Sequence, residues 1–403
     1  MNIKWYKISL LFFLSVALMG TLLRGFALFN IPLVYKNLVH AHSHVAFQGW
    51  VYTLLLLMVP HLFLSKSQII KGRYSLQFKL TIFIITGVMI SFIFQGYGLF
   101  SILFSSLFQL MNYWFIFQFF KDSKKLNNTK KKAVSIRFIK TGFWLGLLST
   151  IAPWGIGILS AKGLANTEAY HAVIYFFLHF QYNGWFLFVL IGLLFKWLEN
   201  KEISFNHQNA TRFYWFLTLA VIPAYTLSLL GMSFKHYIII PAAISAVLQL
   251  VSLFYLLMLL KKLTLKGFVH QKTIVKPFIF ICISGFIIKI ILQFISILPI
   301  VEHYAFGNRN FILAYLHLCL IGVISFGLIT LLFQLNWLQN NKLTNLGALC
   351  LVVGFLTSEI ILIINGLGWQ QFYVGLFTFS ALMAIGILIL LISNYSKKLN
   401  YEN

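Results

Sequence analysis

Charged residues are scarce in this sequence of 403 residues. Asp and Glu together number only 7, and all charged residues make up 9% of the chain, whereas 60% of it is hydrophobic. Soluble globular proteins carry about a quarter charged residues, which cover their surface. The composition therefore excludes an ordinary soluble fold and predicts an all-α integral membrane protein.

Cysteine is also scarce, at three residues, Cys282, Cys319 and Cys350. None of them stands at a spacing that is typical of a disulfide framework, a zinc motif or the c-type haem attachment CxxCH. We interpret all three as free cysteines that fill space between helices.

Long hydrophobic runs are abundant. A membrane-spanning helix needs roughly 20 apolar residues, because backbone polar groups must be satisfied within the segment. This criterion predicts twelve transmembrane helices, at about 8–34, 42–64, 79–98, 101–120, 141–160, 168–197, 211–232, 236–260, 275–298, 310–334, 343–366 and 370–393. The connections are short and the longest polar stretch is 121–140, so we expect 1–403 to form a single transmembrane domain.

Basic residues are distributed unevenly over the predicted connections. If the N-terminus is cytoplasmic, the inner segments hold 25 of the 31 Lys and Arg residues, and the outer loops hold only Lys36, Lys162, Lys235 and Arg309. The positive-inside rule then predicts that both termini are cytoplasmic. The net charge of +24 is explained by this topology and by anionic lipid head groups, so the sequence gives no reason to expect a nucleic-acid partner.

A short phrase repeats along the chain, in which a histidine is followed five residues later by glycine. The histidines are His44, His179 and His317, separated by 135 and 138 residues, and Trp follows the glycine in the first two copies. Since a third of the chain is about 134 residues, we predict three pseudo-repeats of four helices, at about 1–135, 136–270 and 271–403. Transporters built from two halves of six helices do not match this pattern.

The predicted topology places the three histidines at one depth, in the first turns of helices that descend from the outer face. Ionisable groups within a bilayer are costly and are taken as functional by default, and imidazole is a common ligand of haem and metals. The glycine lies roughly 140° around the helix from the histidine. Its missing side chain would admit either a flat macrocycle or a neighbouring helix.

These features resemble the catalytic subunit of the haem-copper oxidase superfamily, which includes cytochrome oxidases and nitric oxide reductases. The similarity lies in the three groups of four helices, the phrase Gly20-Thr21-Leu-Leu-Arg24, and the His-x-x-x-x-Gly-Trp phrase. The resemblance implies that His44 and His317 are the axial ligands of a low-spin haem b. It also implies that His179 or His171 matches the histidine that binds copper or non-haem iron.

The sequence departs from that family at two places. Tyr315-Leu-His317 stands where the family has His-x-His, and 211–232 contains no histidine where the family has a pair. The usual binuclear centre therefore cannot be assembled from these positions, and an oxidoreductase activity stays an open question. The resemblance still implies a bacterial inner membrane protein, with a respiratory electron donor or other oxidase subunits as partners.

A competing interpretation concerns the cluster His40, His42 and His44. If the helix extends back to residue 40, His40 and His44 lie four residues apart on one face, a spacing that zinc-binding helices use. His42 would then point elsewhere. The alternative function is thus a haem-free transporter or metal-handling protein with an outer copper or zinc site.

Three charged residues lie within predicted helices. Arg24 suits a haem propionate through a bidentate contact, or its side chain extends to the outer head groups. Lys289 and Glu359 are the ionisable groups predicted deepest in the membrane, where they could pair with each other or take part in a proton path.

Overall fold

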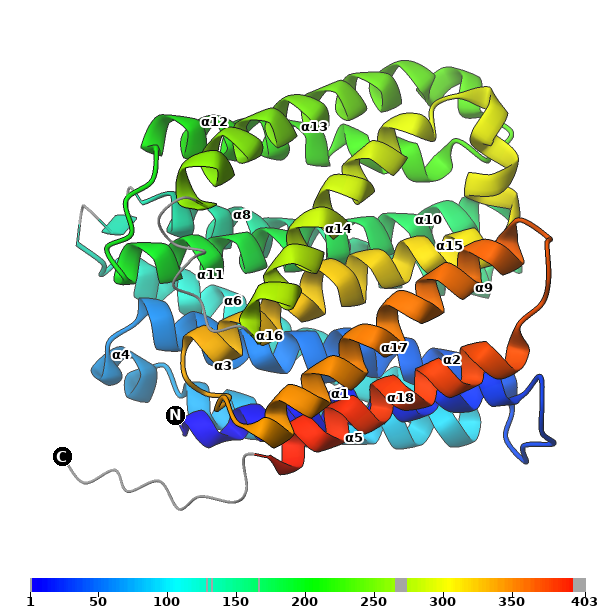
Figure 1. Ribbon diagram of the computed structural model, residues 1–403, viewed down its shortest axis with the longest axis horizontal. Coiled ribbons are helices and arrows are strands. Elements are labelled where there is room, and N and C mark those ends of the chain that lie inside the picture. The colour runs from blue at the N-terminus through cyan, green and yellow to red at the C-terminus, as the bar shows by residue number, and fades with distance from the viewer. Residues whose placement is uncertain (1, 128–129, 132, 166, 265–273, 394–403) are drawn as a thin grey trace. The chain divides into compact units, whose positions relative to one another are not determined.

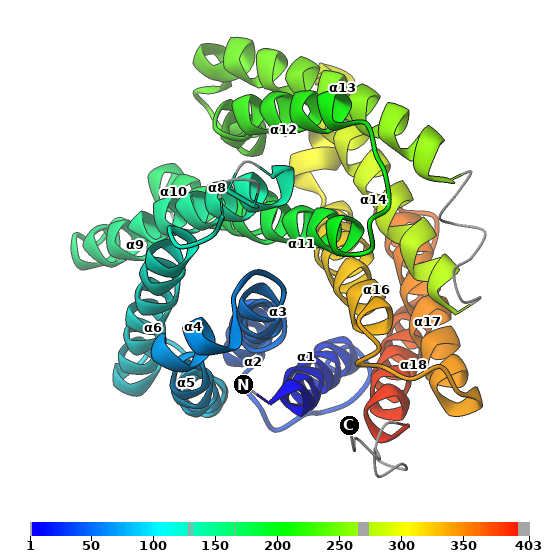
Figure 2. The ribbon, with the colours of Figure 1, turned by 90° about the vertical axis from the view of Figure 1, so that its left-hand side faces the viewer.

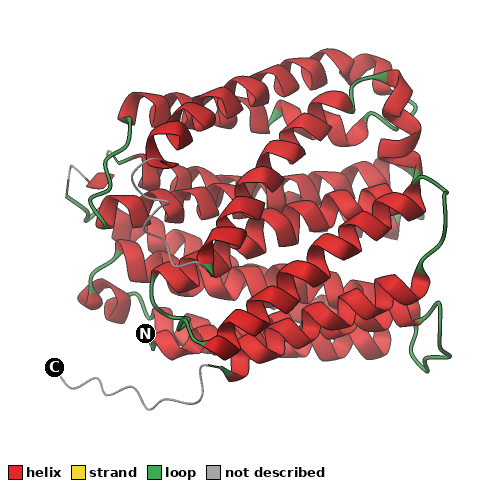
Figure 3. Ribbon diagram, viewed as in Figure 1, coloured by secondary structure: helices red, strands yellow, loops and turns green. Residues whose placement is uncertain are grey.

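The computed structural model describes residues 2–127, 130–131, 133–165, 167–264 and 274–393. Every regular element within these ranges is a helix, as the colouring of Figure 3 shows. The chain divides into two compact units. Unit 1 comprises Met1–Asp122, Lys272–Ile279 and Ser325–Asn403, and unit 2 comprises Ser123–Gln271 and Phe280–Ile324.

Unit 1 contains the N-terminal and C-terminal helices (Figure 1). Its elements are α1 (Tyr6–Gly25), α2 (Tyr35–His44), the π-helical segment η2 (Val45–Tyr52), α3 (Thr53–Phe63), α4 (Lys66–Lys71), α5 (Tyr74–Gln95), α6 (Leu99–Ser123), α16 (Phe326–Gln334), α17 (Lys342–Gly366) and α18 (Tyr373–Ile392). Within this unit α1 packs against η2 and α18, and α2 packs against α5.

Unit 2 contains the middle of the chain. Its elements are α8 (Val134–Ser149), α9 (Ile151–Ala161), α10 (Glu168–Leu178), the π-helical segment η3 (His179–Phe186), α11 (Leu187–Asn200), α12 (His207–Val221), the 3-10 segment η4 (Pro223–Leu229), α13 (Lys235–Thr264), most of α14 (Val275–Ile295), the 3-10 segment η5 (Pro299–Val301), the π-helical segment η6 (His303–Gly307), α15 (Arg309–His317) and the π-helical segment η7 (Leu318–Ser325). Its core is rich in aromatic rings, among them Phe138, Phe188 and Phe213.

Within the described residues, eleven helices are long and apolar enough to cross a membrane. They are Ile3–Gly25, Tyr35–Phe63, Tyr74–Gln95, Leu99–Ser123, Val134–Ala161, Glu168–Asn200, Lys235–Lys261, Val275–Ile295, Arg309–Gln334, Lys342–Gly366 and Tyr373–Ile392. Several are seen nearly end-on in Figure 2. The chain is thus an all-α, multi-pass membrane protein that contacts the lipid bilayer. The orientation of its termini and its three pseudo-repeats stay predictions.

The segment predicted as the seventh span differs from a continuous helix. It consists of α12, which is 15 residues long and ends at Val221, followed by the 3-10 segment η4 that starts at Pro223. Proline has no backbone N–H and its ring clashes with the preceding turn, so it interrupts an α-helix. The Tyr225 N–H, which would reach Val221 O in an α-helix, instead bonds Ile222 O at 3.2 Å.

Glycines allow close contact between α17 and α18, which run alongside each other in Figure 1. A Cβ on Gly347 would lie 2.9 Å from Gly386 O, and one on Gly386 would lie 2.7 Å from Gly347 O. Since the obstructing atoms are backbone, the two helices can pack this closely only without side chains at these positions.

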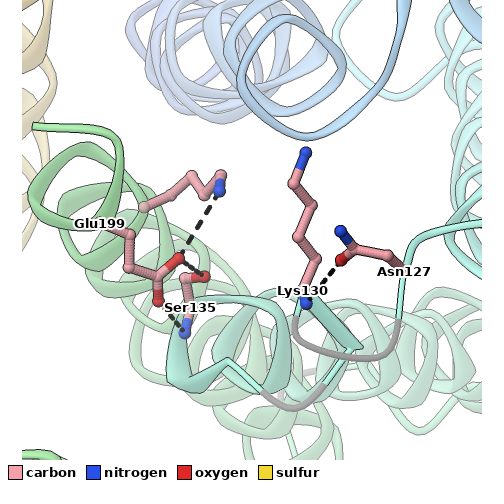
Figure 4. A network of polar contacts seen from close by, with 5 residues as sticks. Asn127, Lys130, Ser135 and Glu199 are labelled. Atoms are coloured by element: carbon pink, nitrogen blue, oxygen red, sulfur yellow. Dashed lines mark hydrogen bonds and ion pairs between the residues drawn. The ribbon is translucent and has the colours of Figure 1, made fainter. Parts of the chain in front are cut away.

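A carboxylate connects the start of α8 to the end of α11 (Figure 4). Glu199 accepts hydrogen bonds from Ser135 Oγ at 2.7 Å and from Ser135 N at 3.4 Å, and pairs with Lys196 at 3.6 Å. In the same view Lys130 N donates to Asn127 Oδ1 at 2.9 Å. A negative charge at a helix N-terminus is favourable because the helix dipole is positive there.

Candidate functional site

The three repeated histidines share one backbone feature. His44 is the last residue of α2 before η2, His179 is the first residue of η3 after α10, and His317 is the last residue of α15 before η7. Each therefore lies at a change from α-helix to π-helix. π-Helical turns are rare and frequently mark functional sites. The sequence repeat thus coincides with a structural repeat that hydropathy did not predict.

His44 lies among aromatic side chains in unit 1. Its ring stacks on Phe92, with 4.3 Å between centroids, and its Nε2 is 3.3 Å from the hydroxyl of Tyr97. One turn further along, Gln48 Nε2 is 3.3 Å from His44 Nδ1. The other end of that amide, Gln48 Oε1, is buried and has no hydrogen-bond partner within the described residues.

His179 has the same arrangement in unit 2, where Asn183 Nδ2 lies 3.3 Å from its Nδ1. Its Nε2 lies 2.8 Å from Val221 O, the carbonyl that the break after α12 frees. A carbonyl only accepts, so Nε2 carries the proton and Nδ1 accepts from Asn183. Binding a metal through His179 would require one of these bonds to break, and that role stays a prediction.

The repeated glycine marks a close approach to the preceding helix. A Cβ on Gly49 would lie 3.0 Å from Phe12 Cβ of α1, and one on Gly184 would lie 3.0 Å from Leu145 Cβ of α8. Near the third copy, the close approach involves a glycine of the preceding helix α14 instead. A Cβ on Gly285 would lie 3.2 Å from Val323 of η7. In the first two copies the repeated glycine thus admits a neighbouring helix.

The tryptophans that follow the first two glycines also contact the preceding helix. Trp50 stacks on Phe13 of α1 with 4.3 Å between centroids and donates from Nε1 to Ser325 Oγ at 2.9 Å. The Trp185 ring covers Gly146 of α8, whose Cβ would lie 2.8 Å from it. The Gly-Trp pair therefore fixes how η2 packs against α1 and how η3 packs against α8.

The cluster His40, His42 and His44 does not converge on one point. α2 does extend back beyond residue 40, and the rings of both His40 and His44 contact Tyr97 and Phe92. His42 turns the other way, with Nδ1 3.0 Å from Val16 O of α1. Nowhere in the described ranges do three His, Cys, Asp or Glu side chains form a group that could hold a metal ion.

The phrase Gly20-Thr21 has a structural role beside this cluster. A Cβ on Gly20 would lie 3.1 Å from His42 Cε1, so the glycine makes room for that ring. Thr21 Oγ1 bonds Ala17 O of its own helix at 2.9 Å. Arg24 lies in the last turn of α1 and is half-buried, and its role toward a haem propionate stays a prediction.

Of the remaining predicted residues, His171 and Lys289 lie in unit 2 and Glu359 lies in unit 1. His171 Nδ1 lies 2.9 Å from Thr167 O, one turn earlier in the chain. Lys289 is 3% exposed, and its Nζ donates to Gln293 Oε1 at 2.9 Å. Glu359 lies on α17 in unit 1, and its pairing with Lys289 stays a prediction.

Sequence reasoning missed Gln48 and Asn183. A signal was present, because an amide residue stands four positions after the histidine in the first two copies and Ile321 replaces it in the third. Residues four apart on a helix are neighbours, so the amides could have been assigned to the imidazoles. Comparison of the sequence with protein-family models and with curated proteins finds no match.

Proposed function

We propose that this protein binds haem b through His44, as the core subunits of haem-copper oxidases do, in a bacterial inner membrane with both termini cytoplasmic. The observation that carries the proposal is the His44–Gln48 pair. An imidazole that ligates iron through Nε2 needs its Nδ1–H held by an acceptor. The amide of Gln48 lies at Nδ1, and its oxygen has no other partner in the described part of the chain.

The residues around His44 fit such a ligand. Turning the Gln48 amide over places Oε1 on Nδ1–H and leaves the lone pair of Nε2 for iron, in a position beside the Tyr97 hydroxyl. The Phe92 ring holds the imidazole plane from one side. Bound haem would supply one-electron transfer, and a respiratory electron donor is the partner that this chemistry requires.

Optical spectra of the purified protein test the proposal. We expect a reduced-minus-oxidised Soret and alpha band that is lost in His44→Ala and shifted or weakened in Gln48→Leu. His317→Ala tests the second axial ligand that the family resemblance implies. His61→Ala is the control, because His61 lies on the same helical run and its ring contacts Trp337.

Two outcomes would contradict the proposal. One is folded protein without haem after expression with ample haem supply. The other is a haem spectrum that His44→Ala leaves unchanged. Carbon monoxide binding to the reduced protein then reports whether an open coordination position exists, which the missing histidines of 211–232 argue against.

A further inference from the structure

Lys289 is a buried cation in the membrane-spanning helix α14. Its side chain is 3% exposed, and its Nζ donates to a neutral oxygen, Gln293 Oε1, at 2.9 Å. The centre of the Phe286 ring lies 5.9 Å from Nζ. Among the described residues of unit 2, no carboxylate forms an ion pair with this lysine. Since an unmatched buried charge is strongly unfavourable, a negative charge within reach of Nζ would stabilise the fold.

The surroundings of Lys289 are apolar. Its neighbours on α14, Phe286 and Ile290, belong to the hydrophobic core of unit 2. The ring of Phe213 from α12 lies against Phe286, with 6.4 Å between centroids. Charges attract each other more strongly in such surroundings than in water. Lys289 is therefore placed where a counter-ion is held most firmly.

Contacts between α14 and η7 show which residues Lys289 faces. Cys282 Sγ donates to Val323 O at 3.3 Å, and a Cβ on Gly285 would lie 3.4 Å from Leu318 Cδ1. A step forward along α14 therefore corresponds to a step backward along η7, so the two segments are antiparallel. Lys289 is about one turn beyond Gly285, and it faces the residues around and before Leu318.

Tyr315 provides a hydrogen-bond donor in that direction. Its hydroxyl is close to Cys319, and the charge of Lys289 also acts on Cys319. The Tyr315 oxygen is buried and has no hydrogen-bond partner within the described ranges. A neutral amine would accept from such a hydroxyl, but an ammonium group has no acceptor. An unused O–H donor beside an unmatched positive charge is complementary to an anion.

His179 is the other ionisable side chain on which the charge of Lys289 acts. Both of its nitrogens are already engaged, Nε2 by Val221 O at 2.8 Å and Nδ1 by Asn183 Nδ2 at 3.3 Å. The imidazole is thus neutral and does not compete with Lys289 for a negative ligand.

We propose that Lys289 Nζ and Tyr315 Oη bind a small monovalent inorganic anion of about the size of chloride, inside unit 2. The ammonium supplies the positive charge and the phenol donates a hydrogen bond. Gln293 Oε1 accepts from a second proton of Nζ and thereby orients the ammonium. The buried apolar side chains around the site leave room for a small ion and not for a large organic anion. The site does not involve His44.

Anion binding is measured by broadening of the chloride NMR line in the presence of the purified full chain. Gluconate replaces chloride at constant ionic strength, because it is too large for the site. We expect saturable broadening that bromide removes and gluconate does not. Lys289→Met should abolish it, and Tyr315→Phe should weaken chloride binding at least about tenfold, since a hydrogen bond to a charged group is lost.

Lys196→Met is the matched control. Lys196 is also a buried lysine of unit 2, at 7% exposed, but it pairs with Glu199 at 3.6 Å. We expect this variant to bind chloride as the unsubstituted protein does. Thermal unfolding gives an independent readout, because a ligand that binds only the folded state raises the unfolding temperature. Chloride should raise it over gluconate in the wild type and in Lys196→Met, and not in Lys289→Met.

Three outcomes would overturn the proposal, and the first needs no variant to fold. One is wild-type protein without saturable chloride binding. Another is chloride binding that appears only in Glu359→Gln, which would make Glu359 the counter-ion of Lys289. The third is binding that both Lys289→Met and Tyr315→Phe leave unchanged, since the anion would then bind elsewhere on the protein.

Discussion

Gly49→Ala tests whether the glycine of the repeated phrase serves helix packing. The added Cβ would lie 3.0 Å from both Cβ and Cγ of Phe12 and 2.9 Å from Val45 Cγ1. The Val45 methyl can rotate, but Phe12 Cβ is fixed to the backbone of α1, so the two helices must separate. Overpacking of this kind costs about 1–3 kcal/mol, and the better helix propensity of Ala returns about 1 kcal/mol.

Gly157→Ala is the matched control for that substitution. Gly157 lies inside α9, and a Cβ there meets nothing within 4 Å. We expect Gly157→Ala to raise the free energy of unfolding by about 1 kcal/mol through propensity alone, and Gly49→Ala to fall about 1–3 kcal/mol below it. Unfolding titrations in mixed detergent micelles measure both. The reasoning is refuted if Gly49→Ala is as stable as Gly157→Ala.

One further substitution tests the packing of unit 1, with a control in unit 2. Trp50→Phe removes the buried donor to Ser325 Oγ and is expected to cost about 1–3 kcal/mol in the same titration, whereas Trp154→Phe, at a residue that is 64% exposed, should be nearly neutral.

Hydropathy and charge were sufficient to predict an all-α membrane protein, because the cost of unpaired backbone groups in lipid dictates the length of each apolar run. The region 211–232 was less well predicted. Its mean composition is apolar, yet Pro223 ends the α-helix at Val221, and the rule that proline interrupts helices could have located this break.

The candidate site was predicted only in part. The repeated phrase in the sequence identified His44, His179 and His317, each with a glycine five residues later. The spacing could not predict the π-helical turns. A π-helical turn has i→i+5 hydrogen bonds in place of the i→i+4 bonds of an α-helix, and no amino-acid composition distinguishes the two. Nor could it show that Val221 O accepts from His179, since that contact depends on packing between residues 42 positions apart.

The orientation of the Gln48 amide depends on which nitrogen of His44 carries the proton. When His44 Nε2 carries a proton, Nδ1 is an acceptor and Gln48 must direct its nitrogen there, so Oε1 faces away from the imidazole, as in the structure. When iron takes the lone pair of Nε2, Nδ1 carries the proton and the amide must turn over. The two N–H donors of Gln48 would then face the position that Oε1 occupies in the structure. Ligation at His44 would therefore replace a hydrogen-bond acceptor with a donor at that buried position.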